Sequence, residues 1–166
     1  RGLGALYAGY YVAELIDSLT ELYDPNSELF DLADETLICL AEGRRVAGHL
    51  LHFEAALLRE LGYLPILDRC AGCGKGVARQ GHVAFGYIDG GVLCGACRSG
   101  RTEVGPVSPA ALDLLERLAD PDADVERLEI DTASQGALRA LLNRYLVNLL
   151  GHRPRMHAYL GVIMKE

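Results

Sequence analysis

The sequence lacks a long apolar run, a secretion signal and an overall excess of positive charge. Charged residues or glycines interrupt every apolar stretch before it reaches the about 18–20 residues of a membrane-spanning helix, so we expect no membrane contact. No basic segment followed by an apolar one opens the chain, which argues against a secretory leader. The first residue is Arg1 and not methionine, so we expect further residues before it in a full-length, cytoplasmic protein.

The charge balance excludes a protein that wraps nucleic acid with a uniformly basic surface. The chain has 16 basic and 23 acidic residues, a net charge of −7. Residues 1–62 hold 4 basic and 11 acidic residues, residues 63–105 hold 5 and 3, and residues 106–166 hold 7 and 9. Five basic residues and a single acidic one lie in residues 139–166. We therefore expect any anionic partner to bind the middle segment or the C-terminal part.

The first 62 residues predict a bundle of three helices. The chain has 166 residues, of which half are hydrophobic and 23% charged, as in ordinary globular proteins. Apolar residues recur at steps of three and four and predict helices over Leu3–Leu22, Ser27–Gly43 and Val46–Gly62, with Asp24-Pro25 as a break. The apolar side chains of the first helix, Leu3, Leu6 and Tyr10 among them, are expected to face the core. Ser27 is the predicted N-cap of the second helix.

Helical patterns return after residue 105. Ser108 is a predicted N-cap followed by proline at the first helical position, and Pro121 ends that helix. Thr132 has the spacing of a capping box and opens a long helix that closes at Gly151. The stretch from Pro154 to Met164 predicts one last short helix.

The middle of the chain has a different composition. Ten glycines lie among the 36 residues from Cys70 to Gly105, and no helical period is present. His82–Tyr87 and Val92-Leu93 predict the two short strands of a hairpin, which cannot fold unaided. The fold class we predict is mainly α: a helical bundle of residues 1–67 and 106–166, with a small four-cysteine zinc ribbon inserted at 68–105.

The cysteines predict a metal site in this insert. Cys70, Cys73, Cys94 and Cys97 form two C-x-x-C pairs with 20 residues between them, the spacing of a four-thiolate zinc site. Small residues inside and beside each pair allow tight turns that aim both sulfur atoms at one ion. Zinc binding would replace the core that the glycine-rich insert lacks. One structural Zn²⁺ is therefore the expected cofactor, because four protein ligands leave no open position for catalysis.

Other chemistries fit the same four cysteines. The four cysteines could also pair as two disulfides, and rubredoxin-like iron takes the same four thiolate ligands. A thiol-based redox switch or redox-regulated chaperone is the alternative function, since Arg69, Lys75 and Arg98 would lower a thiol pKa. The fifth cysteine, Cys39, lies within a predicted helix and is expected in the core.

No catalytic constellation is present in the sequence. His49 and His52 are three residues apart on a predicted helix, with no third ligand, and are expected to be a partly buried pair. No carboxylate spacing indicates a general acid and base, and no serine lies in a nucleophile elbow. We therefore predict that the protein is not an enzyme.

Several stretches together resemble the bacterial recombination mediator family RecO, without its amino-terminal part. They are Ala8–Leu15 with Asp24-Pro25 and Leu29-Phe30, Phe53–Leu58, Leu61–Pro65, Leu67–Cys70, Gly90–Cys94 and Leu149–Arg153. The resemblance implies a non-enzymatic DNA-repair and recombination protein. Members of this family bind single- and double-stranded DNA, anneal complementary strands and act with RecR to help RecA replace single-strand-binding protein. They carry an amino-terminal OB-fold that is absent here, and much of the DNA affinity is expected to lie in it.

Two groups of basic residues are the candidate partner contacts. The first group comprises Arg139, Arg144, Arg153 and Arg155. They would form a solvated face with weak local ion pairs, or they would bind the acidic tail of single-strand-binding protein, which ends in proline and phenylalanine, while a pocket takes the aromatic ring. A second group on the insert comprises Lys75, Arg79, Arg98 and Arg101, which would meet phosphate or simply solubilise the module.

Overall fold

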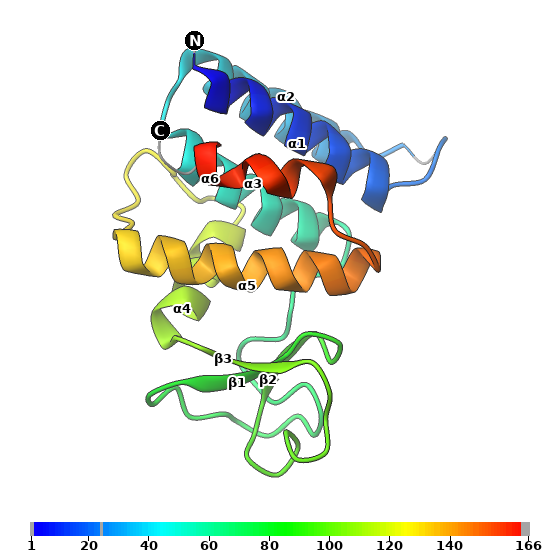
Figure 1. Ribbon diagram of the computed structural model, residues 1–166, viewed down its shortest axis with the longest axis vertical. Coiled ribbons are helices and arrows are strands. Elements are labelled where there is room, and N and C mark those ends of the chain that lie inside the picture. Colours follow the sequence, from blue (N-terminus) through cyan, green and yellow to red (C-terminus); the bar gives the residue numbers. More distant parts are fainter. Residues whose placement is uncertain (1, 24, 164–166) are drawn as a thin grey trace. The chain divides into compact units, whose positions relative to one another are not determined.

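The computed structural model describes residues 2–23 and 25–163, which are mainly helical with one small sheet (Figure 1). The helices are α1 (Leu3–Leu19), α2 (Ser27–Glu42), α3 (Val46–Glu60), α4 (Pro109–Ala119), α5 (Thr132–Leu150), the 3-10 helix η1 (Arg155–Tyr159) and α6 (Leu160–Ile163). The strands are β1 (Val83–Gly86), β2 (Gly91–Leu93) and β3 (Val104–Val107). The predicted fold class is confirmed. Within the described part of the chain, none of the helices has the length and apolar character of a bilayer span.

Most helix ends lie where the sequence predicts them. Gly43 and Gly151 follow α2 and α5 with φ angles of 71° and 74°, a left-handed conformation that glycine adopts without steric cost. The side chain of Ser108 accepts a hydrogen bond from the backbone three residues later, at 3.2 Å, and so caps α4. The predicted last helix is divided into η1 and α6, and Met164 lies outside the described residues.

Two predicted N-caps are wrong by one residue. The side chain of Asn26, and not that of Ser27, accepts from the backbone N–H of Leu29 at 2.9 Å. In the same way Asp131 caps α5 at 2.9 Å, and Thr132 is the first helical residue. In both places an asparagine or aspartate directly precedes a serine or threonine. The amide or carboxylate oxygen of the first residue caps the helix, and the serine or threonine becomes the first helical residue.

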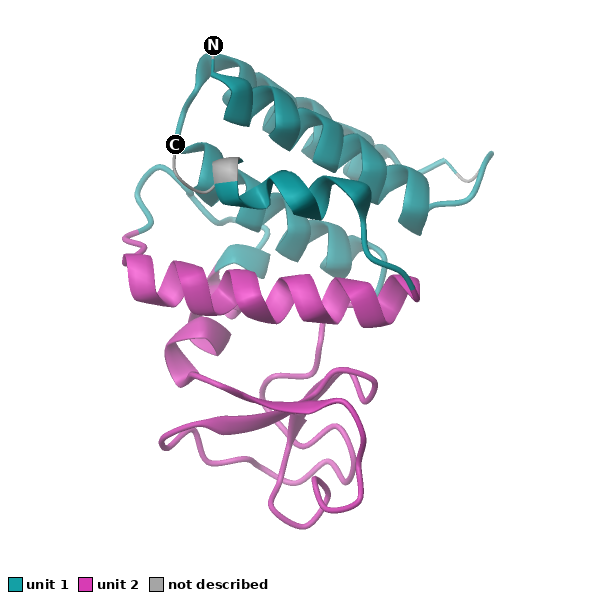
Figure 2. Cartoon of the chain, viewed as in Figure 1, with its two compact units in different colours: residues 1–62, 118–128, 152–166 teal, residues 63–117, 129–151 magenta. Residues whose placement is uncertain are grey.

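The chain forms two compact units (Figure 2). Unit 1 comprises residues 1–62, 118–128 and 152–166, and unit 2 comprises residues 63–117 and 129–151. The cysteine insert lies in unit 2 together with α5 and most of α4. Folding of the insert as a domain separate from the rest of the chain stays a prediction.

Unit 1 is a helical bundle. In it α1 packs against α2, α3, η1 and α6, and α2 also packs against α3. The fully buried apolar side chains include Ala8, Tyr11, Val12 and Leu15 of α1 and Leu50, Leu51, Phe53, Leu57 and Leu58 of α3. By contrast Leu3, Leu6 and Tyr10 are 56%, 52% and 58% exposed, so the expectation that they face the core is wrong. α1 has a second apolar face that the bundle does not cover.

A polar network is enclosed in the core of unit 1. The hydroxyl of Tyr11 donates to the carboxyl group of Glu54 at 2.6 Å and lies 3.1 Å from Nε2 of His157. Tyr11 and Glu54 are fully buried, and His157 is 7% exposed. These hydrogen bonds join α1, α3 and η1. They also give partners to polar groups that would be costly to bury without one.

Side chains at the start of α3 and along it hold the segment 118–128 by its backbone. The guanidinium of Arg45 donates to the carbonyl oxygens of three residues of this segment, at 2.5, 2.9 and 2.8 Å. His52 binds the carbonyl of Leu118 through Nδ1 at 2.8 Å, and Arg59 donates to the carbonyl of the next residue. The segment is therefore fixed although it forms little regular structure.

Unit 2 is built on a three-stranded antiparallel sheet with the order β2-β1-β3. The strands predicted over His82–Tyr87 and at Val92 are present as β1 and β2. The sequence does not predict β3, because Gly105 and Pro106 are uncommon within strands; here β3 lies at the edge, where proline is tolerated. The ring of Phe85 is buried between strands and α5, edge-on to Tyr145 at 5.9 Å.

The Tyr11 network leads to a stability prediction. Tyr11→Phe removes the hydroxyl and leaves the buried Glu54 carboxyl without this donor, so we expect the free energy of unfolding to fall by about 1–3 kcal/mol. Urea denaturation followed by circular dichroism measures it. Tyr10→Phe is the matched control, since Tyr10 is the neighbouring, exposed tyrosine. Equal stability of the two variants would show that the network contributes nothing.

Candidate metal centre

A short segment running along β2 places the first cysteine pair. The N–H of Ile66 donates to the carbonyl of Gly90 at 2.8 Å, and the N–H of Val92 donates to the carbonyl of Ile66 at 2.9 Å. Further along, the N–H of Ala71 donates to Val92 at 2.8 Å. The approach is so close that a Cβ atom at Gly91 would lie 2.5 Å from the Ile66 oxygen. The first pair therefore lies beside the end of β2, where the second pair begins.

Tight turns then direct the sulfur atoms. The N–H of Cys70 donates to the carbonyl of Lys75 at 2.7 Å, and the N–H of Gly74 donates to the carbonyl of Cys70 at 2.8 Å. Gly74 has a φ of 72°, which favours glycine at this place. A Cβ atom on Gly72 would lie 3.1 Å from Sγ of Cys97. Glycine at these two positions lets the two cysteine pairs approach each other.

The four predicted ligands form one cluster. The Sγ atoms of Cys70, Cys73, Cys94 and Cys97 all lie within 4.8 Å of one another, and those of Cys73 and Cys94 are 3.8 Å apart. All four are free thiols and not disulfides. A tetrahedral ion with metal–sulfur bonds of about 2.3 Å places its sulfur ligands about 3.8 Å apart. The cluster could therefore hold a metal ion.

Backbone amides inside the cluster favour negatively charged sulfur. The N–H of Cys94 donates to Sγ of Cys70 at 3.3 Å and lowers the pKa of that thiol to about 6. The N–H of Cys97 donates to Sγ of Cys94 at 3.4 Å and lowers the pKa of Cys94. The hydrogen bond between the side chain of Cys97 and the Cys94 sulfur raises the pKa of the Cys97 thiol to about 12. Ionised sulfur at Cys70 and Cys94 therefore disfavours ionisation of Cys97. A bound cation would remove this repulsion between thiolates.

The basic residues predicted on the insert differ in their surroundings. Lys75 and Arg98 are exposed. Arg79 pairs with two carboxylates of α4, and Arg101 lies 2.9 Å from a carboxylate oxygen of Asp89. Their role as phosphate contacts stays a prediction, and the ion pairs leave Lys75 and Arg98 as the two that are more available to an external anion.

The two arginines of α5 are not equivalent either. Arg139 is only 7% exposed. Arg144 lies 3.0 Å from a carboxylate oxygen of Glu103, and its guanidinium stacks over the ring of Tyr87 at 4.3 Å. Nothing in the sequence signals this stack, because the three residues lie far apart along the chain. Binding of a partner by Arg139 and Arg144 stays a prediction.

The remaining two predicted arginines belong to unit 1, where Arg153 and Arg155 are both exposed. The carboxylate of Glu14 accepts hydrogen bonds from the backbone N–H groups of Arg155 and the next residue, at 2.7 and 2.9 Å. The start of η1 is thereby fixed to α1. Arg155 also borders a hollow that includes Tyr10, Glu14 and His152.

Sequence reasoning missed two hollows in unit 1. The first is an apolar groove of about 750 Å³ between α1 and α2, lined mainly by Leu3, Leu6, Tyr10, Leu37 and Ala41. The helical spacing of these residues is visible in the sequence, but spacing alone does not distinguish a core face from an open groove. The second is a polar pocket beside Cys39, which is partly exposed there and not in the core as predicted.

Comparison with known proteins identifies what the chain is similar to. A family model described as recombination protein O C terminal matches residues 2–157. DNA repair protein RecO of Rhodopirellula baltica is 34% identical, over 96% of this chain and 68% of the relative. The Roseiflexus protein of the same name is 35% identical over 92% of this chain and 54% of the relative. That of Anaeromyxobacter dehalogenans is 34% identical, with 97% and 63% covered.

The chain thus spans about half to two thirds of the length of these curated relatives, and the matching family model describes a C-terminal region. The match includes α1 to α5, the start of η1, the sheet and all four clustered cysteines. The chain belongs to the RecO family of DNA repair proteins and corresponds to its C-terminal part.

Proposed function

We propose that this chain is part of a non-enzymatic mediator of DNA repair and homologous recombination. The observation that carries the proposal is the family match over residues 2–157. In this function the full protein binds DNA and RecR in the cytoplasm, helps to load RecA on single-stranded DNA and promotes strand annealing. Residues 1–166 supply the helical unit and the cysteine cluster, and DNA is bound mainly through the OB-fold that the family resemblance implies.

We propose further that Cys70, Cys73, Cys94 and Cys97 hold one structural Zn²⁺. The donor set and the 3.8 Å separation of two of the sulfur atoms support this, as do the backbone N–H groups that donate to Cys70 and Cys94. When bound, zinc would supply cross-linking and no catalysis, because four protein ligands close its coordination sphere. The residues of this chain position the ligands through the glycine turns and the pairing with β2.

A thiol redox switch is the second candidate function. The lowered pKa of Cys70 favours it, since the thiolate is the species that reacts with oxidants. The burial of Cys70 opposes it, because an oxidant must reach the sulfur atom. Oxidation with mild peroxide separates the two. A switch would release zinc stoichiometrically with a gain of activity, whereas a structural site would resist or simply unfold.

The proposed partner of unit 1 is the acidic, proline- and phenylalanine-terminated tail of single-strand-binding protein. The apolar groove between α1 and α2 is large enough for an aromatic ring, and its side chains are exposed. Tyr10 lines both this groove and the hollow that contains Arg155 and His152. A peptide with its ring in the groove would thus bring its carboxylates near Arg155.

Zinc content tests the metal proposal. We expect about one zinc per purified chain, and loss of most of it in Cys73→Ser, because three ligands bind zinc far more weakly than four. Mass spectrometry of the metal and a thermal melt measure both effects, and the melting temperature should fall with the zinc. Cys39→Ser is the control, since Cys39 lies outside the cluster. Equal zinc content in both variants would refute the assignment.

A peptide titration tests the partner proposal. A fluorescent acidic peptide ending in proline and phenylalanine should bind saturably, and Leu6→Asp should weaken it at least about tenfold, because a carboxylate would oppose the ring in the groove. Fluorescence anisotropy measures the affinity. Leu22→Asp is the matched control, since Leu22 is exposed but does not line the groove.

Charge is tested in the same assay. Arg155→Glu should weaken the peptide and reduce the salt dependence of its affinity. Arg144→Glu tests the alternative site on α5; Arg139→Glu is less informative, because a reversed charge at this buried position would also destabilise the fold. Binding that is indifferent to Leu6→Asp and to both charge reversals would exclude the groove and these arginines as the site, and no binding at all would exclude the tail as a partner of this chain.

A further inference from the structure

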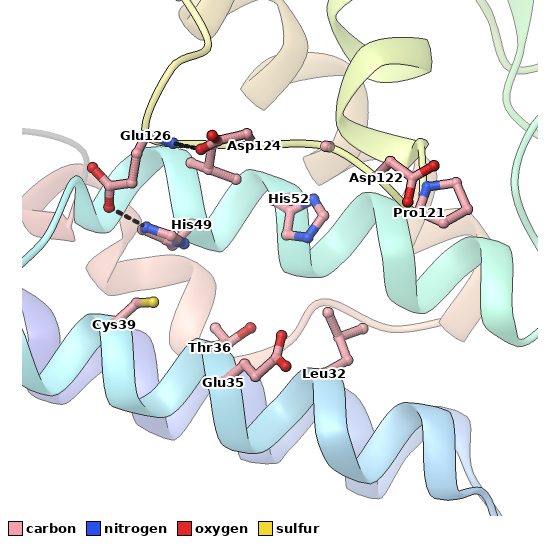
Figure 3. Close-up of a pocket in the computed structure, with 12 residues that line it drawn as sticks. Leu32, Glu35, Thr36, Cys39, His49, His52, Pro121, Asp122, Asp124 and Glu126 are labelled. Atoms are coloured by element: carbon pink, nitrogen blue, oxygen red, sulfur yellow. Dashed lines mark hydrogen bonds and ion pairs between the residues drawn. The ribbon is translucent and has the colours of Figure 1, made fainter.

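The polar pocket of unit 1 has features of a binding site that the proposed function does not use. It has a volume of about 410 Å³ and lies between α2, α3 and the segment 118–128 (Figure 3). One face of α2 lines it with Leu32, Glu35, Thr36 and Cys39, and α3 contributes His49 and His52. Residues 121–126 close the third side.

Thr36 is a buried polar group directed at this pocket. The residue is only 4% exposed, and among the described residues its hydroxyl makes no hydrogen bond. Figure 3 shows the side chain turned from α2 toward the pocket. The hydroxyl is not among the fully buried side-chain atoms that lack a partner, so it is open to the pocket and a ligand there can reach it.

His52 presents a hydrogen-bond acceptor to the same pocket. Its Nδ1 lies 2.8 Å from the carbonyl oxygen of Leu118, and a carbonyl can only accept, so the proton is on Nδ1. Burial lowers the pKa of His52 from its ordinary 6.5, so the ring is neutral at pH 7. Nε2 of the neutral ring therefore carries a lone pair.

Two carboxylates line the pocket together with this acceptor. Glu35 lies on α2, across the pocket from His52 in Figure 3, and Asp122 lies next to Pro121 in the segment 118–128. Among the residues that the structure describes, neither is in an ion pair. The other end of the pocket is different, because Glu126 lies 2.9 Å from Nε2 of His49 and 3.9 Å from Arg44. Among the described residues, the carboxylates of Glu35 and Asp122 are thus not neutralised by an ion pair, as that of Glu126 is.

These acceptors are spread along the pocket wall and do not converge on a point. Within residues 2–23 and 25–163, the four-cysteine cluster alone brings three metal-ligating atoms within 4.8 Å of one another. The arrangement therefore suits an extended, planar cation with several donors more than a metal ion. A guanidinium has five N–H donors in one plane and carries its charge at any physiological pH.

We propose that this pocket binds an arginine side chain of a protein partner, with Glu35 and Asp122 accepting from its guanidinium and with Nε2 of His52 and the hydroxyl of Thr36 completing the set of acceptors. Charge complementarity identifies the partner surface as basic, since residues 1–62 carry 11 acidic and 4 basic residues. The pocket volume exceeds that of an arginine side chain. The proposal goes beyond the mediator function and does not depend on zinc or on the apolar groove, so its failure leaves both unaffected.

The test is an NMR titration of the 166-residue chain with N-acetyl-arginine methylamide. We expect saturable shifts confined to residues of the pocket, and at least about fivefold weaker binding of the matching lysine compound, which has a single-point charge and no planar fork. Glu35→Gln should weaken arginine binding about tenfold, as loss of a charge-assisted hydrogen bond implies.

Asp34→Asn is the matched control, because it removes the same charge from the neighbouring position of α2, which does not line the pocket. It should change the affinity less than about twofold. Equal effects of the two variants, equal binding of arginine and lysine compounds, or shifts scattered over the acidic surface would overturn the proposal. Much tighter binding of free arginine than of the blocked compound would overturn the protein partner in favour of a free amino acid.

The pH dependence of the affinity for the arginine compound supplies an independent test. Protonation of His52 turns its acceptor into a donor, and burial lowers its pKa from 6.5, so affinity should hold at pH 7 and fall only as the pH decreases below 6.5. The titratable or charged groups facing His52 are Glu35 and Cys39 of α2, His49 and Arg59 of α3, and Asp122 and Glu126 of the segment. His52→Gln keeps an acceptor that does not titrate, and it should flatten the pH dependence. A profile unchanged by His52→Gln would remove His52 from the site.

Discussion

Three main-chain hydrogen bonds between residues 66–71 and the edge of β2 determine what unit 2 can become. They place the first cysteine pair beside the second and do so with atoms that every residue possesses. The sequence must supply residues without side chains at two places: Gly91, where β2 meets the segment 66–71, and Gly72, where the two cysteine pairs meet. Glycine at these two positions thus follows from the close approach of the segments, and the metal proposed for the cluster would secure the arrangement.

The sequence predicts the helices and the cysteine cluster well for physical reasons that differ. Helix positions follow from a local period, and Gly43 and Gly151 end their helices because the left-handed conformation selects glycine. The cluster follows from ligand spacing, which is also local. β3 escapes prediction because Gly105 and Pro106 in its middle disfavour a strand, and its conformation depends on pairing with β1.

The unforeseen parts of the site all depend on contacts between distant segments. Whether an apolar side chain such as Leu6 faces the core or a groove is decided by what packs over it, and α1 has more apolar residues than its neighbours cover. The stack of Arg144 on Tyr87 and the polar pocket around His52 likewise bring together residues from separate elements. Family resemblance supplies the biological context that neither pattern nor geometry contains.

Each unit therefore offers its own kind of chemistry. Unit 2 has a cluster of thiols that an ion can cross-link, and three of its arginines, Arg79, Arg101 and Arg144, are already engaged by carboxylates. Unit 1 has an apolar groove and a separate acidic pocket, which differ in the partners they suit. The mediator function proposed above would benefit from surfaces whose chemistry does not overlap, because occupation of one surface then need not compete with occupation of another.

The way in which the α3 region holds the segment 118–128 bears on how the sequence can drift. Arg45, His52 and Arg59 bind carbonyl oxygens, which are the same whatever side chain the segment carries. Substitutions within the segment would leave these hydrogen bonds in place as long as its length and path are kept. Change at the exposed positions of the segment should thus be tolerated better than change at Arg45, His52 or Arg59, and it would alter one wall of the polar pocket, and its ligand preference, without loss of the fold.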